Sequence, residues 1–340
     1  MNLGAKDFTA MRDAAMLQSS DLVGHYHRNV RMDHEGDSFV VRVPNPRSQV
    51  MDLAIWAEHL VLLALSPDMT RVPRLYYCEE DPYFQVQGFI EGELVEDLCP
   101  RGSTIAPGIA EDVTHFFEEL LSFPAEKVPG ISRPWPRDGD SQGFAGILLK
   151  FGHDLRVKCS QRMPRLFSEL GIPESPFEEL GKAASGLTSR PFRLLHGDIH
   201  RGNMISDDGR TYFLDWQLAL WGDPVYDLAD HVHKMFYTPA DAKRAVDQWA
   251  EVAPDSCGRG MAEDLEFYLG YERVKSAIVD TVRGAEHISK TVEGSKERAD
   301  AVQQLTGKIN RARPYWAPAF REPLEPLAVA EAVVSLYGRG

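Results

Sequence analysis

A polar segment followed at once by a β-hairpin signal constrains the fold more than any other feature of this sequence. The polar segment, HGDIHRGN, ends at Asn203, and the residues ISDDGRTYFLDW follow after Met204. Asp208-Gly209 is a typical two-residue hairpin turn, and TYFL is a typical strand that leads to Asp215. A hairpin here folds Asp215 back towards Asn203, so we expect these two side chains to lie close together.

Three explanations compete for the polar residues: a phosphoryl-transfer loop, a metal cluster of His196, Asp198 and His200, and a surface turn without chemistry. Transfer of a phosphoryl group to a hydroxyl requires a carboxylate that holds the hydroxyl, and oxygen ligands for the magnesium ion that bridges the phosphates. Asp198 is such a carboxylate, and Asn203 and Asp215 offer the oxygen atoms that Mg²⁺ prefers. The spacing fits the first explanation, while the other two stay open.

Length and composition indicate a chain with a packed core. At 340 residues it is long enough for one large domain or two lobes. Hydrophobic residues make up 43% and charged residues 26%, close to the average of globular proteins. The formal net charge of −14 argues against a nucleic-acid partner, which needs clustered lysine and arginine, and would suit a cationic ligand.

Neither the cysteines nor the apolar runs indicate export. The four cysteines lie far apart without a CxxC pair, so we expect reduced thiols. The first residues lack a basic segment followed by an apolar one, and the apolar run from Leu53 to Leu65 is interrupted by Glu58 and His59. We therefore expect a cytoplasmic protein without a membrane partner.

The pattern of extended and helical segments changes near Gly88. Before it, NVRMDHEGDSFVVRVP predicts two strands around a turn, and VPRLYYCEEDPYFQVQGFI is again extended. The residues from Met51 to Leu65 between them are helical by content. After Gly88, longer helical segments predominate. One apolar helix face is predicted from Phe267, Tyr271, Val274, Ile278 and Val282.

HGDIHRGN, followed by LDW and GDPVYDLAD, resembles the aminoglycoside phosphotransferase family, which includes macrolide phosphotransferase-like enzymes and is related to protein kinases. The resemblance implies an α+β, bilobal protein-kinase-like fold with a small β-rich N-lobe and a larger, mainly α-helical C-lobe. The nucleotide-binding N-lobe is expected at residues 1–88. The C-lobe, with the catalytic loop and the substrate site, is expected at residues 89–340, with the hinge at 89–92.

The resemblance also implies roles for individual residues of the motif. Asp198 would be the catalytic base, and Asn203 and Asp215 would be the magnesium ligands. Asp227 would brace the catalytic loop, and His196 would be a packed structural histidine.

The nucleotide site implied by the resemblance uses residues of the first lobe. Arg42 stands where protein kinases carry the lysine that binds phosphates, and arginine can bind phosphate with two N–H groups. Glu58 is its expected partner on a helix. Gly24 marks the loop expected to cover the phosphates, and Gly88 and Ile90 are expected to contact the nucleotide base.

By this resemblance we expect an ATP:alcohol phosphotransferase that uses ATP (or GTP) and Mg²⁺, as a monomer or homodimer, on a small hydroxylated molecule. We predict that it inactivates an antibiotic of aminoglycoside, macrolide, peptide or nucleoside type, that is, a role in antibiotic resistance. Candidate substrate contacts are Asp198, Asp223, Glu272 and Asp280.

Three alternatives are kept beside this prediction. The first is a metabolic kinase for a choline- or homoserine-like compound. A non-catalytic nucleotide-binding module is the second, since a fold never guarantees an activity. The third is a metal-dependent hydrolase that uses His196, Asp198 and His200.

Overall fold

The computed structural model describes residues 3–18, 27–45, 53–66, 68–316 and 322–337. By their contacts the residues form two compact units. The first unit consists of Met1–Pro134, Arg193–Asp227 and Lys234–Pro254, and the second of Trp135–Phe192, Leu228–His233 and Asp255–Gly340. The lobe boundary predicted between residues 88 and 89 is a different division of the chain, and it stays a prediction.

The first unit contains a four-stranded antiparallel sheet with the strand order β1-β2-β4-β3. Its strands are β1 (His27–His34), β2 (Asp37–Pro44), β3 (Leu75–Glu80) and β4 (Tyr83–Gly88). β1 and β2 are the two strands predicted around a turn in NVRMDHEGDSFVVRVP, and β3 and β4 form the extended segment predicted up to Gly88. Both predictions are confirmed.

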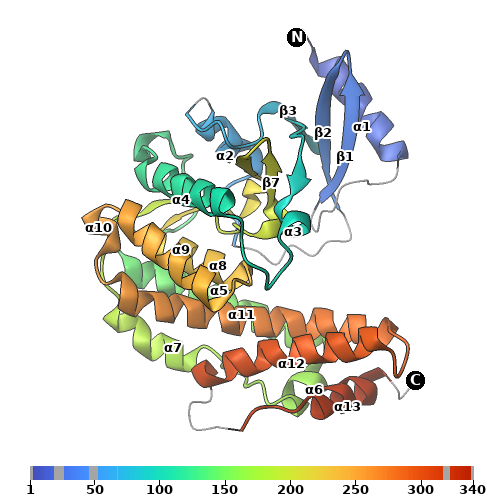
Figure 1. Ribbon diagram of the computed structural model, residues 1–340, viewed down its shortest axis with the longest axis vertical. Coiled ribbons are helices and arrows are strands. Elements are labelled where there is room, and N and C mark those ends of the chain that lie inside the picture. The colour runs from blue at the N-terminus through green and yellow to red at the C-terminus, as the bar shows by residue number, and fades with distance from the viewer. Residues whose placement is uncertain (1–2, 19–26, 46–52, 67, 317–321, 338–340) are drawn as a thin grey trace. The chain divides into compact units, whose positions relative to one another are not determined.

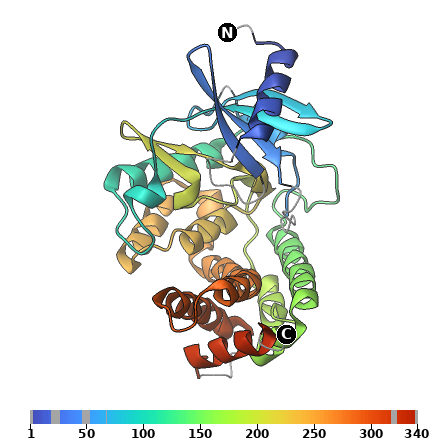
Figure 2. The ribbon, with the colours of Figure 1, turned by 90° about the vertical axis from the view of Figure 1, so that its right-hand side faces the viewer.

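Strand alternation gives this sheet one apolar and one polar face. The apolar face is formed by alternate residues of β2 and β4: Phe39, Val41, Phe84 and Val86. Helix α1 (Ala5–Leu17) lies on this face (Figures 1 and 2), and its buried Phe8 and Met11 belong to the same core cluster. Arg42 lies directly opposite Gln85 in the register of β2 and β4, so both side chains belong to the other face. That polar face contributes to the site described below.

The remaining elements of the first unit are α2 (Glu58–Leu65), β5 (Glu93–Leu94), α3 (Val95–Leu98), α4 (Pro107–Ser122), η1 (Ala125–Lys127), β6 (Arg193–Leu195), η3 (Arg201–Asn203), β7 (Met204–Asp207), β8 (Arg210–Phe213), η4 (Trp216–Leu218), β9 (Leu220–Gly222) and α9 (Pro239–Val252). Helix α8 (Pro224–Lys234) has residues in both units. The helix predicted from Met51 begins only at Glu58, whose carboxylate lies in the first turn, where the helix dipole favours an acid.

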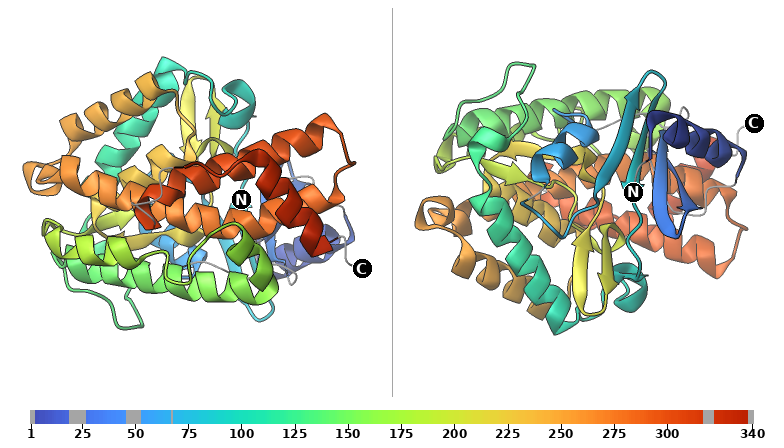
Figure 3. Two further views of the ribbon diagram at one scale, coloured as in Figure 1. Left: turned by 90° about the horizontal axis from the view of Figure 1, so that it is seen from below. Right: turned by 90° about the horizontal axis from the view of Figure 1, so that it is seen from above.

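The second unit is helical in the part that the structure describes. Its elements are α5 (Ser141–Arg162), α6 (Pro164–Glu169), α7 (Glu178–Ala183), η2 (Ala184–Gly186), α10 (Asp255–Gly258), α11 (Met261–Lys290), α12 (Lys296–Trp316) and α13 (Pro326–Tyr337). The long helix α11 packs against α5, α12 and α13 (Figure 3). All five residues of its predicted apolar face are buried, so this prediction is confirmed. None of the helices in the described ranges has the length and apolar character needed to cross a membrane.

Candidate active site

The polar segment begins as a loop after β6, and Asp227 of α8 holds its backbone. Oδ2 of Asp227 accepts a hydrogen bond from His196 N at 3.0 Å, and Oδ1 accepts one from Gly197 N at 2.7 Å. Gly197 has a φ of 73°, and a Cβ atom here would lie 2.5 Å from Leu218 O, so only glycine fits. Burial raises the pKa of Asp227 to about 6, against the opposing effect of the two N–H donors.

His196 is a buried, neutral side chain behind this loop. The centroid of its ring lies 4.5 Å from that of Trp216 and 6.1 Å from that of Phe116. Burial lowers the pKa of His196 to about 4. Within the described ranges, no three or more His, Cys, Asp or Glu side chains are grouped so as to hold a metal ion. The alternative hydrolase, with a site of His196, Asp198 and His200, requires such a group.

The predicted hairpin after the polar segment is present. β7 and β8 pair antiparallel, and Asp208 and Gly209 form the turn with φ values of 46° and 78°. At the open end of the hairpin, Leu214 N donates a hydrogen bond to Asn203 O at 2.8 Å. Asp215, the next residue, has a left-handed φ of 64°. The fold thus brings Asp215 back beside Asn203, as the sequence predicted.

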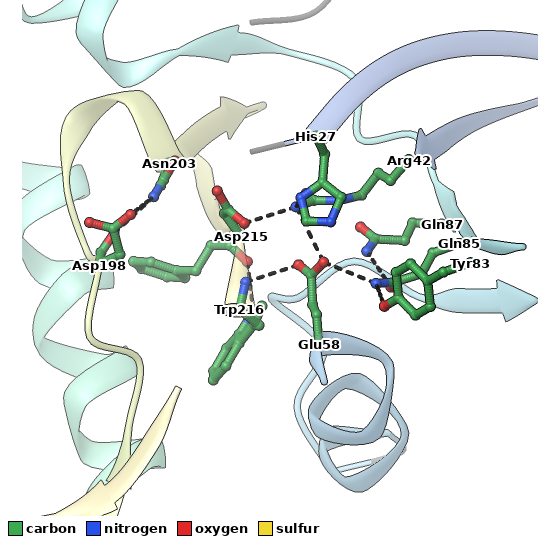
Figure 4. Close-up of polar contacts among 11 residues, drawn as sticks. His27, Arg42, Glu58, Tyr83, Gln85, Gln87, Asp198, Asn203, Asp215 and Trp216 are labelled. Carbon is green, nitrogen blue, oxygen red and sulfur yellow. Dashed lines mark hydrogen bonds and ion pairs between the residues drawn. The ribbon is translucent and has the colours of Figure 1, made fainter. Parts of the chain in front are cut away.

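Asp198 is held by three neighbouring side chains. Asn203 Nδ2 donates to Asp198 Oδ2 at 2.9 Å (Figure 4), and Lys234 Nζ donates to Oδ1 at 2.6 Å. His200 Nε2 lies 3.6 Å from Oδ1. Burial alone would raise the pKa of Asp198, but Lys234 and His200 outweigh it and hold this pKa well below its usual range. Asp198 is therefore an ionised carboxylate with a fixed orientation.

Arg42 of β2 connects the sheet to the hairpin (Figure 4). Its NH2 atom lies 2.8 Å from Asp215 Oδ1 and 3.2 Å from Glu58 Oε2. The ion pair that the sequence analysis expected between Arg42 and Glu58 is present. Glu58 Oε1 accepts a hydrogen bond from Trp216 N at 3.1 Å, so Glu58 also holds the backbone next to Asp215. Burial would lower the pKa of Arg42, but the charges of Glu58 and Asp215 raise it.

Asp215 and Asn203 have the chemistry of magnesium ligands. Burial raises the pKa of Asp215 despite the charge of Arg42, and a divalent cation at this carboxylate would favour its ionised form. Asn203 Nδ2 donates to both Asp198 O and Asp198 Oδ2, which leaves the amide oxygen as its ligand atom. Two oxygen donors, completed by phosphates and water, fit Mg²⁺.

A chain of buried polar side chains that the sequence analysis missed continues from Glu58 into β4 (Figure 4). Gln85 Nε2 donates to Glu58 Oε2 at 3.3 Å, and Gln87 Nε2 donates to Gln85 Oε1 at 3.2 Å. The hydroxyl of Tyr83 also contacts Gln85. The period-two alternation of QVQ could have shown that both glutamines share a face of the sheet with Arg42.

The sequence analysis also missed two titratable side chains beside the site, His27 and Lys234. His27 has its Nδ1 atom 3.5 Å from Arg42 NH2. Burial and the charge of Arg42 lower the pKa of His27 to about 4. Lys234 lies seven residues after Asp227 in one helix, a spacing that places both on the same face, and this spacing could have identified it.

The residues expected to contact the nucleotide base lie at the end of β4. Gly88, its last residue, donates its N–H to Arg74 O at 2.8 Å, and Ile90 lies in the loop between β4 and β5. Gly24, expected to cover the phosphates, lies outside the described residues. The nucleotide contacts of all three stay predictions.

The acids predicted to contact the substrate have other partners. In the first unit, buried Asp223 accepts a hydrogen bond from the backbone N–H two residues later, at 3.0 Å. In the second unit, Glu272 lies 2.6 Å from Lys275, and Asp280 lies 2.5 Å from Lys308. These intramolecular contacts give the three acids a structural role. The substrate contacts predicted for them remain predictions.

Comparison with protein families and curated proteins gives one match. The family described as "Phosphotransferase enzyme family" matches the sequence over residues 22–263. None of the curated proteins matches the sequence.

Solved structures resemble the chain in fold at low sequence identity. The gentamicin–APH(2″)-IIa complex has a TM-score of 0.56 and 17% identity over 90% of this chain and 96% of its own. A thermostable mutant of the aminoglycoside phosphotransferase APH(4)-Ia, in a ternary complex with ADP and hygromycin B, has a TM-score of 0.53 and 14% identity over 91% and 99%. Choline kinase LicA from Streptococcus pneumoniae has a TM-score of 0.54 and 13% identity over 89% and 98%. The predicted kinase-like α+β fold is thereby confirmed.

Proposed function

We propose that this chain, which belongs to the phosphotransferase enzyme family, transfers the γ-phosphoryl group of ATP (or GTP) to a hydroxyl of a small molecule. One observation carries the proposal. The ionised carboxylate of Asp198 is hydrogen-bonded to Asn203, and the backbone hydrogen bond from Leu214 to Asn203 brings the next residue, Asp215, beside Asn203. A base and two metal ligands with separate tasks are what phosphoryl transfer needs.

In this proposal Asp198 orients the acceptor hydroxyl and takes its proton. Its low pKa makes Asp198 a weak base, which suits a loose transition state in which the proton leaves late. Positioning then contributes more to the rate than proton abstraction, because a well-oriented neighbouring group can replace a large part of the entropic barrier. Asp227 supports this task through its hydrogen bonds to the loop backbone.

On the nucleotide side, the Asn203 amide oxygen and the Asp215 carboxylate would hold Mg²⁺. When bound, the ion neutralises charge on the phosphates. Arg42 would bind the same phosphates, with Glu58 holding its guanidinium group. The backbone of Gly88 and Ile90 would contact the nucleotide base.

For the acceptor we propose an antibiotic with free hydroxyl groups. The fold likeness to a gentamicin complex and to a hygromycin B complex supports this class. A metabolic kinase is the second candidate, supported by the likeness to a choline kinase. We expect the enzyme to work as a monomer or homodimer in the cytoplasm, where ATP is available.

The test is ATP consumption by the purified protein with Mg²⁺ across a panel of hydroxylated antibiotics and metabolites. Mass spectrometry then identifies the phosphate adduct. We expect one acceptor class to give an adduct that depends on Mg²⁺. If the protein binds Mg·ATP but phosphorylates no member of a broad panel, the assignment to small-molecule acceptors is wrong. If it does not bind nucleotide, the phosphotransferase proposal itself is wrong.

A further inference from the structure

We propose that Lys234 is a positioning residue that holds the Asp198 carboxylate towards the acceptor hydroxyl and keeps it from binding the metal ion. This inference rests on the proposed function, since it uses the roles given there to Asp198, Asn203 and Asp215. It assigns a task to a lysine that the motif does not contain.

Lys234 donates hydrogen bonds to both a side chain and a backbone carbonyl of the loop. Its ammonium group donates to Asp198 Oδ1 at 2.6 Å and to Gly197 O at 3.0 Å. On the other side of the carboxylate, Asn203 Nδ2 donates to Oδ2 at 2.9 Å. Each oxygen of Asp198 therefore has its own N–H donor, and together the two donors fix the plane of the carboxylate.

The lysine is itself fixed by its place in the fold. Lys234 is the last residue of α8, and the same helix carries Asp227 two turns earlier. Asp227 holds His196 N and Gly197 N, so one helix face binds three consecutive residues of the loop. A cation in the last turn of a helix is also favoured by the helix dipole.

A fixed cation at Asp198 is needed because the carboxylate lies next to the metal ligands. Asn203 links the two sites, since its amide nitrogen binds Asp198 while its oxygen is the ligand atom for Mg²⁺. Carboxylate oxygens are preferred ligands of Mg²⁺, so an unpaired Asp198 would be drawn into the coordination shell. There it would be lost as the group that holds the hydroxyl.

Asp198 and Asp215 differ in the partners that could keep a carboxylate out of the coordination shell of the metal ion. Asp198 has Lys234 and Asn203 on separate oxygens, with His200 nearby. The cation at Asp215, Arg42, is shared with Glu58. A bound divalent ion should therefore stabilise Asp198 less than Asp215, because Lys234 already supplies a counter-charge to Asp198.

A merely structural role for Lys234 predicts different results. If the lysine served only to support the loop through Gly197 O, its replacement would lower stability and leave the metal affinity of the folded protein unchanged or reduced. If the proposal is right, replacement removes the counter-charge of Asp198 and raises metal affinity. Metal affinity therefore separates the two roles.

The experiment titrates the full-length protein with Mn²⁺, followed by electron paramagnetic resonance, with and without ADP. We expect Lys234→Met to bind Mn²⁺ several-fold more tightly than the wild type. Lys234→Arg, which keeps the charge, should stay close to the wild type. The matched control is Lys243→Met, because this lysine on α9 pairs with Asp247 at the surface and its side chain is 77% exposed.

A double variant shows whether the gain comes through Asp198. In Lys234→Met combined with Asp198→Asn, the extra Mn²⁺ affinity should disappear, because the amide is a poorer metal ligand. Unchanged or weaker Mn²⁺ binding by folded Lys234→Met would overturn the proposal. A gain that persists in the double variant would overturn it too. If Lys234→Met does not fold, Lys234→Gln keeps an N–H donor for Gly197 O without the charge, and the same gain is expected.

The kinetic arm uses the acceptor found for the proposed function. Lys234→Met should lower kcat by on the order of 10²-fold, the typical cost of a misplaced catalytic group, with the KM for ATP little changed. A rise in KM at constant kcat would contradict the positioning role. The Mn²⁺ titration without nucleotide needs neither ATP nor an acceptor. If the proposed function is wrong, this titration still shows whether Lys234 lowers the metal affinity of the protein.

Discussion

Replacement of Arg42 by methionine tests the polar network that joins the sheet to the hairpin. Arg42 is the shared cation of Glu58 and Asp215, whose side chains are 2% and 27% exposed. Removal of one partner from a buried ion pair typically costs 3 to 5 kcal/mol, because the remaining charge stays uncompensated. Glu58 keeps hydrogen bonds from Trp216 N and Gln85 Nε2, so we expect the lower end, about 3 kcal/mol.

The assay is urea unfolding followed by circular dichroism, with wild type and variant compared at the same pH. Arg42→Lys keeps a cation that can reach one of the two carboxylates. Its free energy of unfolding should therefore fall by less than that of Arg42→Met. Lys243→Met is the control, since its exposed pair with Asp247 should contribute less than about 1 kcal/mol. A loss of less than about 1 kcal/mol in Arg42→Met would refute the reasoning, because it would mean that Glu58 does not depend on this cation.

Three further predictions concern the loop and the hairpin. Asp215→Asn should weaken Mg·ADP binding by about tenfold or more in calorimetry, and an unchanged affinity would count against its role as a ligand. Gly197→Ala should cost about 2 kcal/mol or more in urea unfolding, because of the positive φ and the contact with Leu218 O, and a neutral result would contradict this geometry. Burial lowers the pKa of His196 to about 4, so its neutral ring contributes stability above pH 6.5 that is lost as the pH falls towards 4. In His196→Asn this loss of stability at low pH, about 3 kcal/mol, should be absent. If the free energy of unfolding falls equally with pH in the variant and the wild type, the prediction is wrong.

The sequence was informative where the signal is local. The hairpin follows from Asp208-Gly209 between two short strands, and its length alone places Asp215 beside Asn203. The ion pair of Arg42 and Glu58 was expected only from the family resemblance, because no local pattern links a residue of β2 to one of α2. Residues close in sequence therefore determine the hairpin but not the ion pair.

The sequence was less informative where contacts depend on packing. Nothing local distinguishes His27 from other histidines, and its contact with Arg42 depends on the register of β1 against β2. The spacing puts Lys234 on the helix face of Asp227, but its contact with Asp198 depends on how α8 packs against the loop. The start of α2 at Glu58 was missed as well, since apolar content gives no precise helix boundary.

The central claim is tested most directly by following label from γ-labelled ATP to a small hydroxylated acceptor, with the wild type and Asp198→Asn side by side. We predict that the wild type transfers the label, and that Asp198→Asn binds Mg·ADP normally but transfers label several orders of magnitude more slowly. Equal transfer by both proteins would contradict the role of Asp198 and, with it, the proposed division of tasks between Asp198 and Asp215.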